Sequence, residues 1–329
     1  VSLTGASNGA IRVGAVGTHQ MWIESSSSPF YGLTRIAIGT RSGCGINAAG
    51  KLYCWGSDSN GQVGDGTGVS NQSLPIQIDP MFSYLEVAVG NSYACGIRTT
   101  GELACWGDNS AGQLGDNTTT ARYAPTAIDI GTTYSKIATY MSTTCGITTS
   151  GDLKCWGAQE YGQVGNNQAT GFQTSPVVIS GGTLYIDLAM GWDHGCAVRA
   201  SGEVDCWGRN DAGQIGDDTL NNALTPTPVL TLTGIQRIYA GQKYSCALNA
   251  LGEAFCWGEG ASGKLGNGSS SGSRVPIPVQ SGSTFSSLSL SSGTTCGIDA
   301  ASGNARCWGY GYYGLLGAGG GGGGSLTPV

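Results

Sequence analysis

Six tandem copies of a unit of about 50 residues constrain this chain more than any other feature. The first cysteine of each copy falls at position 44, 95, 145, 196, 246 or 296, and prolines recur in phase at 75, 125, 176, 226, 276 and 328. A repeat of this length is typical of propellers and solenoids, in which each copy forms one supersecondary unit.

The second copy shows what one unit contains. Residues 85–89 alternate with the period of a strand, and the runs 94–97 and 103–106 form two more short strands around a turn. A Gly-rich loop follows, and then a proline-bearing stretch at 124–128 that suits an edge strand. Four strands in meander order form one propeller blade. We therefore predict one all-β propeller domain with six full four-stranded blades, at about 34–83, 84–133, 134–184, 185–235, 236–284 and 285–329.

Residues 1–33 precede the six copies. Residues 11–18 resemble residues 36–40, and residues 19–23 suit a following strand, so the segment reads as half a blade without its cysteines. It forms either an N-terminal partial seventh blade, which we favour, or a segment outside a six-bladed ring. The unpaired edge of a partial blade would invite strand addition by a second copy.

The twelve cysteines form six pairs with none left over. An even, pairwise pattern predicts disulfides and an oxidising compartment. Zinc would require closer cysteines with nearby histidines, and the chain has only His19 and His194. Pairing across a hairpin leaves a three-residue turn that ends in glycine in five copies, as such turns prefer. The predicted pairs are Cys44–Cys54, Cys95–Cys105, Cys145–Cys155, Cys196–Cys206, Cys246–Cys256 and Cys296–Cys307.

Composition narrows the partners. The chain carries 15 Lys and Arg against 21 Asp and Glu, with a net charge of -6 and no basic cluster, which argues against nucleic acid. No apolar run of about 20 residues is present, so no membrane span is predicted. Each copy also places a tryptophan after its second cysteine, and this shared register favours packing between blades over a ligand-stacking array: Trp55, Trp106, Trp156, Trp207, Trp257 and Trp308.

The motif C-G-I-x3-G-x3-C-W-G-x4-G-Q-[LV]-G-D, best seen at 44–65 and 95–116, resembles the repeat of the regulator of chromosome condensation (RCC1) family. The resemblance covers residues 34–329 and implies a seven-bladed propeller. The nuclear exchange-factor role of the best-known member is not implied here, because this chain is acidic and its cysteines are paired. The cysteine-bearing variant is similar to secreted bacterial RCC1-like proteins, one of which inhibits β-lactamases, and to ectodomains of crinkly-type plant receptor kinases.

The sequence predicts no enzyme, no cofactor and no metal. The nucleophile-elbow, P-loop and zinc-protease motifs are absent, and Asp193 and His194, being adjacent, would point to opposite faces of a strand. The loop from Asp58 to Asp65 offers oxygens that suit calcium, but its Asp and Asn side chains are better explained by turn hydrogen bonds.

The turns between the first and second strands of the copies are the best binding candidates. Their framework is constant while their tips vary, which is how binding surfaces are built. The alternative is that they are plain solvated turns. The candidate residues, of types that anchor recognition, are Arg41, Tyr93, Tyr140, Trp192, Asp193, His194, Lys243 and Tyr244.

Three glycosylation sequons precede proline strands, at Asn71, Asn117 and Asn267, although such triplets also arise by chance in polar loops. Together these features predict a secreted, non-catalytic propeller that binds a protein or glycan partner through its axial loops. The alternative is a glycosylated structural subunit of an extracellular filament or coat, a homo-oligomer that self-associates through the N-terminal partial blade. A secreted enzyme inhibitor or lectin is the third possibility.

Overall fold

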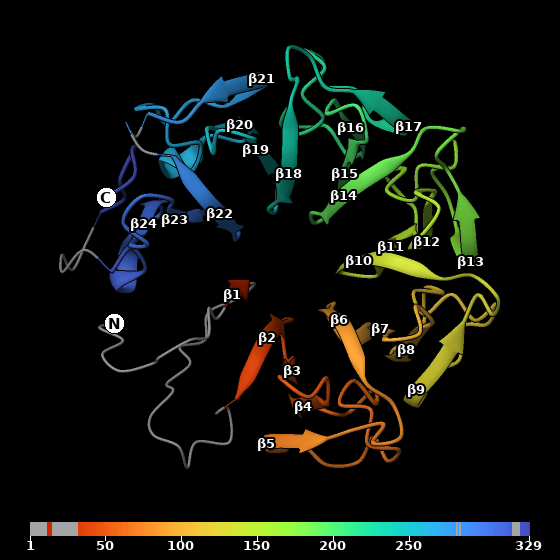
Figure 1. Ribbon diagram of the computed structural model, residues 1–329. Helices are drawn as coiled ribbons and strands as arrows, with labels where there is room; N and C mark the ends of the chain where they lie inside the picture. Colours follow the sequence, from red (N-terminus) through yellow and green to blue (C-terminus); the bar gives the residue numbers. More distant parts are fainter. Residues whose placement is uncertain (1–11, 15–31, 281, 283, 318–322) are drawn as a thin grey trace. The chain divides into compact units, whose positions relative to one another are not determined.

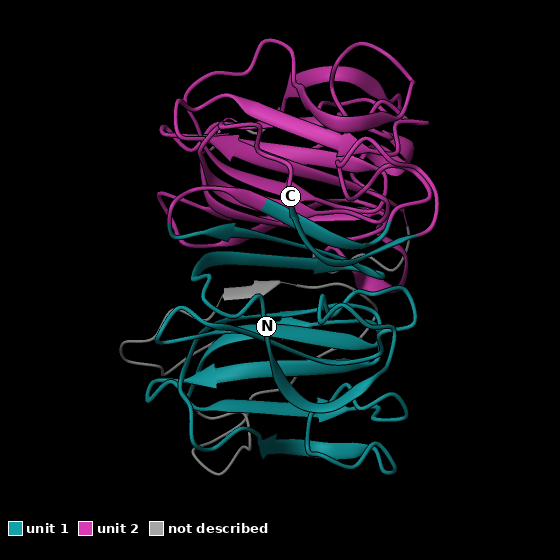
Figure 2. Cartoon of the chain, turned by 90° about the vertical axis from the view of Figure 1, so that its right-hand side faces the viewer, with its two compact units in different colours: residues 1–149, 154–158, 172–177 teal, residues 150–153, 159–171, 178–329 magenta. Residues whose placement is uncertain are grey.

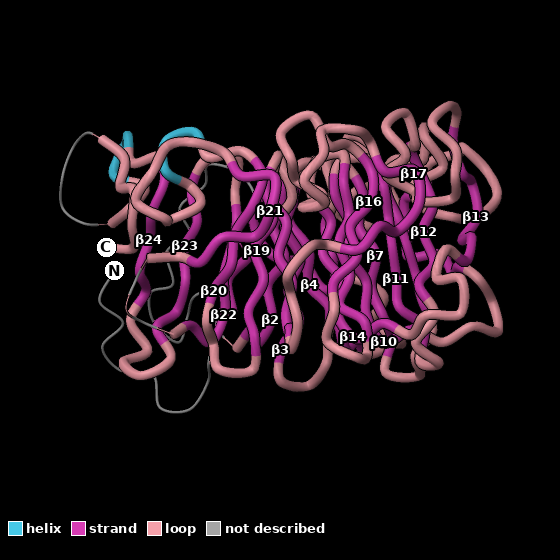
Figure 3. Tube along the Cα trace, turned by 90° about the horizontal axis from the view of Figure 1, so that it is seen from above, coloured by secondary structure: helices cyan, strands magenta, loops and turns pink. Residues whose placement is uncertain are grey.

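The computed structural model describes residues 12–14, 32–280, 282, 284–317 and 323–329. The chain forms two compact units (Figure 2): unit 1 comprises residues 1–149, 154–158 and 172–177, and unit 2 comprises residues 150–153, 159–171 and 178–329. Strands and loops make up almost all of the described chain (Figure 3). No helix in this described part is long and apolar enough to cross a lipid bilayer.

The sheets of the first three repeats lie in unit 1, apart from single residues at the ends of β12 and β13 (Figure 1). Consecutive strands pair antiparallel, so each repeat forms a four-stranded meander. The strands are β2 (Leu33–Ile38), β3 (Ser42–Asn47), β4 (Leu52–Gly56) and β5 (Gln72–Gln77); β6 (Tyr84–Val89), β7 (Tyr93–Arg98), β8 (Leu103–Gly107) and β9 (Arg122–Ile128); and β10 (Tyr134–Tyr140), β11 (Thr143–Thr148), β12 (Leu153–Ala158) and β13 (Phe172–Val178).

Unit 2 holds the sheets of the last three repeats. Its strands are β14 (Tyr185–Met190), β15 (His194–Arg199), β16 (Val204–Gly208) and β17 (Ala223–Pro228); β18 (Ile235–Ala240), β19 (Tyr244–Asn249), β20 (Ala254–Gly258) and β21 (Ser273–Pro278); and β22 (Phe285–Leu290), β23 (Thr294–Asp299) and β24 (Ala305–Gly309), with the 3-10 helices η1 (Ala261–Gly263) and η2 (Tyr312–Gly314). In the last repeat the outer strand is reduced to a bridge from Ser325 to Gly309 and backbone hydrogen bonds from Val329 to Cys307. The predicted all-β fold with one blade per repeat is confirmed, with the four predicted strands in each of the first five repeats and three strands in the sixth.

One described strand, β1 (Arg12–Gly14), comes from the N-terminal segment. It pairs in parallel with β2, through the register Val13 opposite Ile36, and so extends the first sheet to five strands. The rest of the predicted partial blade, including residues 19–23, lies outside the described residues.

The six predicted disulfides are confirmed: Cys44–Cys54, Cys95–Cys105, Cys145–Cys155, Cys196–Cys206, Cys246–Cys256 and Cys296–Cys307. In the second repeat, Cys95 lies directly opposite Cys105 in the β7–β8 hairpin, with Cα atoms 4.1 Å apart. The turn glycine there, Gly101, has a φ of 88°, the left-handed conformation that the three-residue turn requires.

Five of the six tryptophans pack between blades, as predicted. In unit 1 the Trp106 indole donates a hydrogen bond of 3.1 Å to the carbonyl oxygen of Gln62, in the long loop of the preceding blade. A Cβ added at Gly64 would lie 2.7 Å from that indole, so the loop needs glycine for the ring to approach. The same contact recurs for Trp156, Trp207, Trp257 and Trp308, which donate to Gln113, Gln163, Gln214 and Lys264.

Candidate functional site

In unit 1 the first turns of three blades lie close together. A shallow hollow is lined by residues 39–40, 89–91 and 140–141, and the Asn91 backbone amide donates to the Met141 carbonyl oxygen over 3.3 Å. Met141 has a φ of 44°, an unusual conformation for a residue other than glycine. Arg41 is exposed and Tyr140 is half-buried beside this hollow, so both predicted residues reach the surface.

Three predicted binding residues are instead buried, and the structure corrects the sequence-based expectation for them. Tyr93, His194 and Tyr244 have no exposed surface. The Tyr93 hydroxyl donates to the Thr143 carbonyl oxygen, and the Tyr244 hydroxyl donates to that of Thr294, in both cases in the next blade. The physical reason is that the third turn residue is already the first residue of the second strand, where its side chain points between blades.

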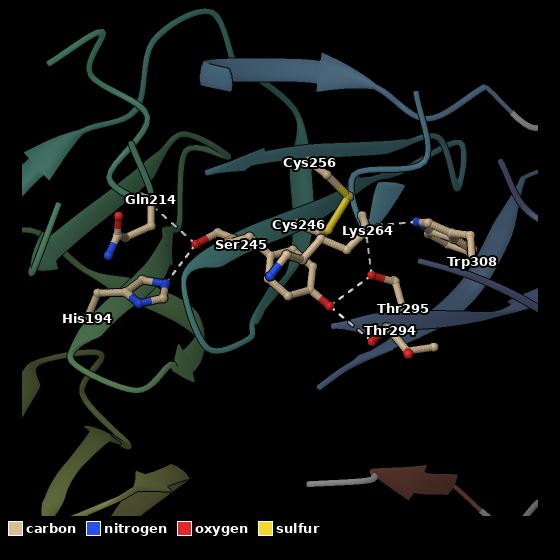
Figure 4. Close-up of a disulfide and its surroundings, with 10 residues drawn as sticks. His194, Gln214, Ser245, Cys246, Cys256, Lys264, Thr294, Thr295 and Trp308 are labelled. Carbon is tan, nitrogen blue, oxygen red and sulfur yellow. Dashed lines mark hydrogen bonds between the residues drawn. A yellow bond between two sulfur atoms is a disulfide. The ribbon is translucent and has the colours of Figure 1, made fainter. Parts of the chain in front are cut away.

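His194 occupies the same position and contacts the next blade through Ser245 (Figure 4). The Nε2 atom lies 2.9 Å from the Ser245 hydroxyl, which in turn donates to the Gln214 carbonyl oxygen over 3.2 Å. Burial lowers the pKa of His194 to about 4, and its Nδ1 atom has no hydrogen-bond partner. Because His194 and Ser245 are both fully buried, this pair joins two blades and is not accessible to a substrate.

Unit 2 presents a network of charges at the same end of its strands. The Arg209 guanidinium lies 3.2 Å from the Asp193 carboxylate and 2.7 Å from that of Asp211. The Lys243 ammonium lies 3.0 Å from Asp211, and Arg209 also covers the ring of Tyr161 at 4.6 Å from its centroid. The first turns of two blades therefore join the long loops that follow β12 and β16, and the half-buried Trp192 lies beside Asp193 in its turn.

Asp193 and Lys243 were expected from the sequence, whereas Arg209, Asp211 and Tyr161 were missed. Burial raises the pKa of Asp193 despite its bond to Arg209, so the ion pair opposes the cost of desolvation. For Asp211 burial alone would raise the pKa, but hydrogen bonds from Lys243, Gln214 and Arg209 lower it. The missed residues follow the third strand of their blades. In a meander the third strand ends at the same edge of the blade as the turn between the first and second strands, so these residues lie beside that turn.

Polar side chains in the long loop after the third strand of a blade form hydrogen bonds within that loop. Asn109 accepts a hydrogen bond of 3.0 Å from the Leu114 amide and donates one of 3.0 Å to the Asp116 carboxylate. Within the described residues, no three His, Cys, Asp or Glu side chains gather as a metal site would need. The oxygens that suggested calcium are thus engaged with backbone and side-chain donors.

The three sequons differ in accessibility. Asn117 is exposed, with a φ of 63°, and its side-chain oxygen accepts only a long hydrogen bond of 3.4 Å from the Thr174 hydroxyl. Asn71 is exposed as well, but its side-chain oxygen accepts a hydrogen bond of 3.2 Å from the Asp58 amide. Asn267 is half-buried and accepts one of 3.2 Å from the amide of Ser269, inside its own sequon. Asn117 is therefore the most accessible candidate for a glycan.

The sequence of this chain is similar to those of known proteins. Residues 5–328 match a family model described as RCC1-like domain. A human protein named probable E3 ubiquitin-protein ligase HERC4 is 26% identical over 216 residues, which cover 64% of this chain but only 16% of that protein.

Two solved structures share the fold. Prp20p from Saccharomyces cerevisiae has a TM-score of 0.78 at 18% identity, covering 90% of this chain and 76% of the other. The CRINKLY WD40 ectodomain of the Arabidopsis thaliana receptor kinase ACR4 has a TM-score of 0.53 at 20% identity, covering 83% and 78%.

Proposed function

The chain belongs to the RCC1-like domain family, and we propose that it works outside the cell as a non-catalytic binding module. Propellers of this family serve as protein-binding scaffolds, and Prp20p is described as binding Gsp1p and histones. The six disulfides support an oxidising compartment. The similar ACR4 domain is named as a receptor ectodomain, which is in keeping with this location.

The observation that carries the proposal is the pattern of first turns. Their sequences vary on a constant disulfide-bonded frame, and in unit 2 they hold a fixed network of charged and aromatic side chains. Ordered Arg, Trp and Tyr side chains in such a network provide recognition at a low entropic cost. We infer that Trp192, Asp193 and Lys243 of unit 2 contact a protein or glycan, and we treat Arg41 and Tyr140 of unit 1 as a separate candidate surface.

The experiment is binding of the non-reduced protein to arrays of secreted proteins and of glycans. We expect a ligand whose affinity falls at least about tenfold in Trp192→Ala and Lys243→Ala, as loss of an interface anchor does. Leu251→Ala is the matched control, because Leu251 is 73% exposed and lies in the turn between the second and third strands, at the other end of its blade. No bound ligand, or binding lost only in the control, would contradict the proposal.

A structural role in a homo-oligomer is the second candidate, and the surface of the last blade favours it. Leu315, Leu326 and Val329 are 43–48% exposed there, and Tyr313 is 91% exposed. A Cβ added at Gly317 meets nothing within 4 Å among the described residues, whereas the equivalent glycines of the other five loops each contact a tryptophan. A second copy that packs on this surface would bury the exposed apolar side chains.

Light scattering of non-reduced protein separates the two candidates. A mass that stays at 33.4 kDa plus any glycan on dilution supports the monomeric binding module. A concentration-dependent mass that falls in Leu315→Lys supports the structural subunit.

A further inference from the structure

One buried position holds together the long loop in the first, second and fourth blades. In the second blade this position is Asn109, whose oxygen accepts from the Leu114 amide and whose amide nitrogen donates to Asp116 over 3.0 Å. In the fourth blade Asn210 does the same and donates to Asp217 over 3.2 Å. Both asparagines are fully buried, and each satisfies its polar atoms by accepting on one side and donating on the other.

The first blade has an aspartate at this position. Asp58 is fully buried, and its Oδ1 atom accepts from the Val63 amide over 2.9 Å, just as Asn109 accepts from Leu114. Its Oδ2 atom accepts from the Gly68 amide over 3.1 Å. Seven residues further on stands Asp65, at the same separation as Asn109 from Asp116. An ionised carboxylate has no N–H to donate, so the amide–carboxylate bond of the second and fourth blades becomes a contact between two carboxyl groups.

No cation among the described surroundings balances this pair. In the second blade Arg122 adds a hydrogen bond of 2.7 Å to Asp116, but its counterpart in the first blade is the neutral Gln72, which donates to Asp65 over 3.0 Å. Thr67 donates to Asp65 as well, over 2.7 Å.

The groups that face the loop from neighbouring elements are likewise neutral or already paired. From β9, the Tyr123 ring covers Gly68, and Arg122 is engaged by Asp116. In the β2–β3 turn, the backbone carbonyl oxygen of Arg41 accepts a hydrogen bond from the Ser57 amide. The described contacts therefore bring neutral donors, and no guanidinium or ammonium, to the two carboxyl groups.

We propose that Asp58 and Asp65 bind one proton between them, with Asp58 protonated and donating to Asp65 as asparagine does in the second and fourth blades. Two adjacent carboxyl groups that share a buried site hold one proton above the ordinary range of aspartate. Burial raises the pKa of Asp58, and the charge and hydrogen bond of Asp65 raise it further, against the opposing hydrogen bonds from the Val63 and Gly68 amides. Burial alone would raise the pKa of Asp65 too, but bonds from Thr67, Gln72 and Asp58 lower it.

The proton has a mechanical consequence, because the same loop receives the tryptophan of the next blade. Gln62 accepts the Trp106 indole N–H over 3.1 Å, and the Gly64 backbone lies against its ring. When the proton leaves, the two carboxylates repel each other inside this loop. The junction between the first and second blades is therefore tighter in acid and looser as the pH rises.

The sign of the effect follows from linkage. Since the pKa of Asp58 is raised in the folded protein, the fold binds this proton more tightly than the unfolded chain does. Its contribution to stability is present at the unfolded pKa of about 3.9 and is lost as pH rises through the folded pKa. Replacing the proton donor by a permanent amide removes this loss.

The experiment compares full-length wild type with Asp58→Asn in urea unfolding between pH 4 and pH 8. Asp58→Asn places in the first blade the residue of the second and fourth blades, so we expect it to fold. Its folding constant should stay within about twofold of wild type at pH 4 and exceed it by at least about tenfold at pH 8. The reciprocal variant Asn210→Asp should acquire the pH dependence that Asp58→Asn loses.

Carboxyl carbon NMR gives a second readout that does not depend on global stability. An aspartate carboxyl of wild type should titrate above the ordinary range, and this titration, unlike the raised titration of Asp193, should be absent in both Asp58→Asn and Asp65→Asn. The proposal is overturned if Asp58→Asn removes no wild-type titration above the ordinary range. It is also overturned if millimolar calcium chloride stabilises wild type but not Asp58→Asn at pH 7, because the pair would then bind a metal ion in place of the proton.

Discussion

A single position, the third residue of each first turn, shows how one residue changes the chemistry of a blade junction. Tyrosine holds this position in the second and fifth blades, and histidine holds it in the fourth. All three reach the next blade, but only His194 can take up a proton as the pH falls.

We predict that His194 makes the protein sensitive to acid. Its pKa is about 4 in the fold, whereas an unfolded histidine has about 6.5, so the unfolded chain takes up the proton first. Stability is therefore lost as pH falls from 6.5 to 4, by up to about 3 kcal/mol. His194→Gln keeps a donor for Ser245 and cannot be protonated.

Urea unfolding of wild type and His194→Gln at pH 7, 5.5 and 4.5 checks this. The gap between the two proteins should shift in favour of the variant as the pH is lowered. Parallel profiles would show that the histidine is protonated as easily in the fold as in the unfolded chain.

Among the sequons we predict that Asn117 carries the glycan most often when the protein is made in a eukaryotic secretory pathway. Its side chain is exposed, whereas Asn267 is half-buried. Mass spectrometry of deglycosylated peptides from the secreted protein measures the occupancy of each site. Higher occupancy at Asn267 would contradict the ranking by accessibility.

At the scale of the element, the contact between a tryptophan and the glycine-rich loop before it joins neighbouring blades. Gly115 has a φ of 81°, and a Cβ there would lie 2.7 Å from Trp156. We predict that Gly115→Ala costs about 2–5 kcal/mol, from the left-handed backbone and the clash together. Gly131→Ala should cost only about 1–2 kcal/mol, because Gly131 has a φ of 93° and open space around it.

Urea unfolding of the two alanine variants measures the difference directly. Equal losses would mean that the tryptophan contact does not hold the blades together, and that the backbone conformation alone requires glycine at both positions.

The disulfides should also differ from one another. The cysteines of the first five pairs are fully buried, whereas Cys296 and Cys307 are partly exposed. Since a thiol must reach the sulfur atoms to reduce them, we predict that Cys296–Cys307 is reduced first. Limited reduction, alkylation and peptide mapping give the order. Prior reduction of any of the buried pairs would contradict it.

The structural features that depend on residues close together in the sequence could be predicted from the sequence. The disulfide pairing and the turn glycines follow from the spacing within one hairpin, as between Cys95, Gly101 and Cys105. The network of Asp193, Arg209 and Asp211 was not predicted, since it joins residues that approach only through the meander. Tyr93 was misjudged because the boundary between turn and strand lies one residue earlier than expected.

For the molecule as a whole, the proposed function depends on where the chain works. Only 11% of its residues are charged, and a covalent bridge closes the central hairpin of every repeat. A bridge across a loop of this length contributes on the order of 2–3 kcal/mol in the chain-entropy model. In a reducing compartment the protein would lose this support in all repeats, and its blades would rely on non-covalent contacts alone.

The most direct test is therefore to block free thiols in the cells and medium that produce the protein before lysis, and then to weigh the intact chain. We predict that no alkyl group is added and that peptide mapping recovers the six pairs within repeats. A chain that gains alkyl groups at these cysteines in its native compartment would show a reduced protein and contradict the extracellular binding function.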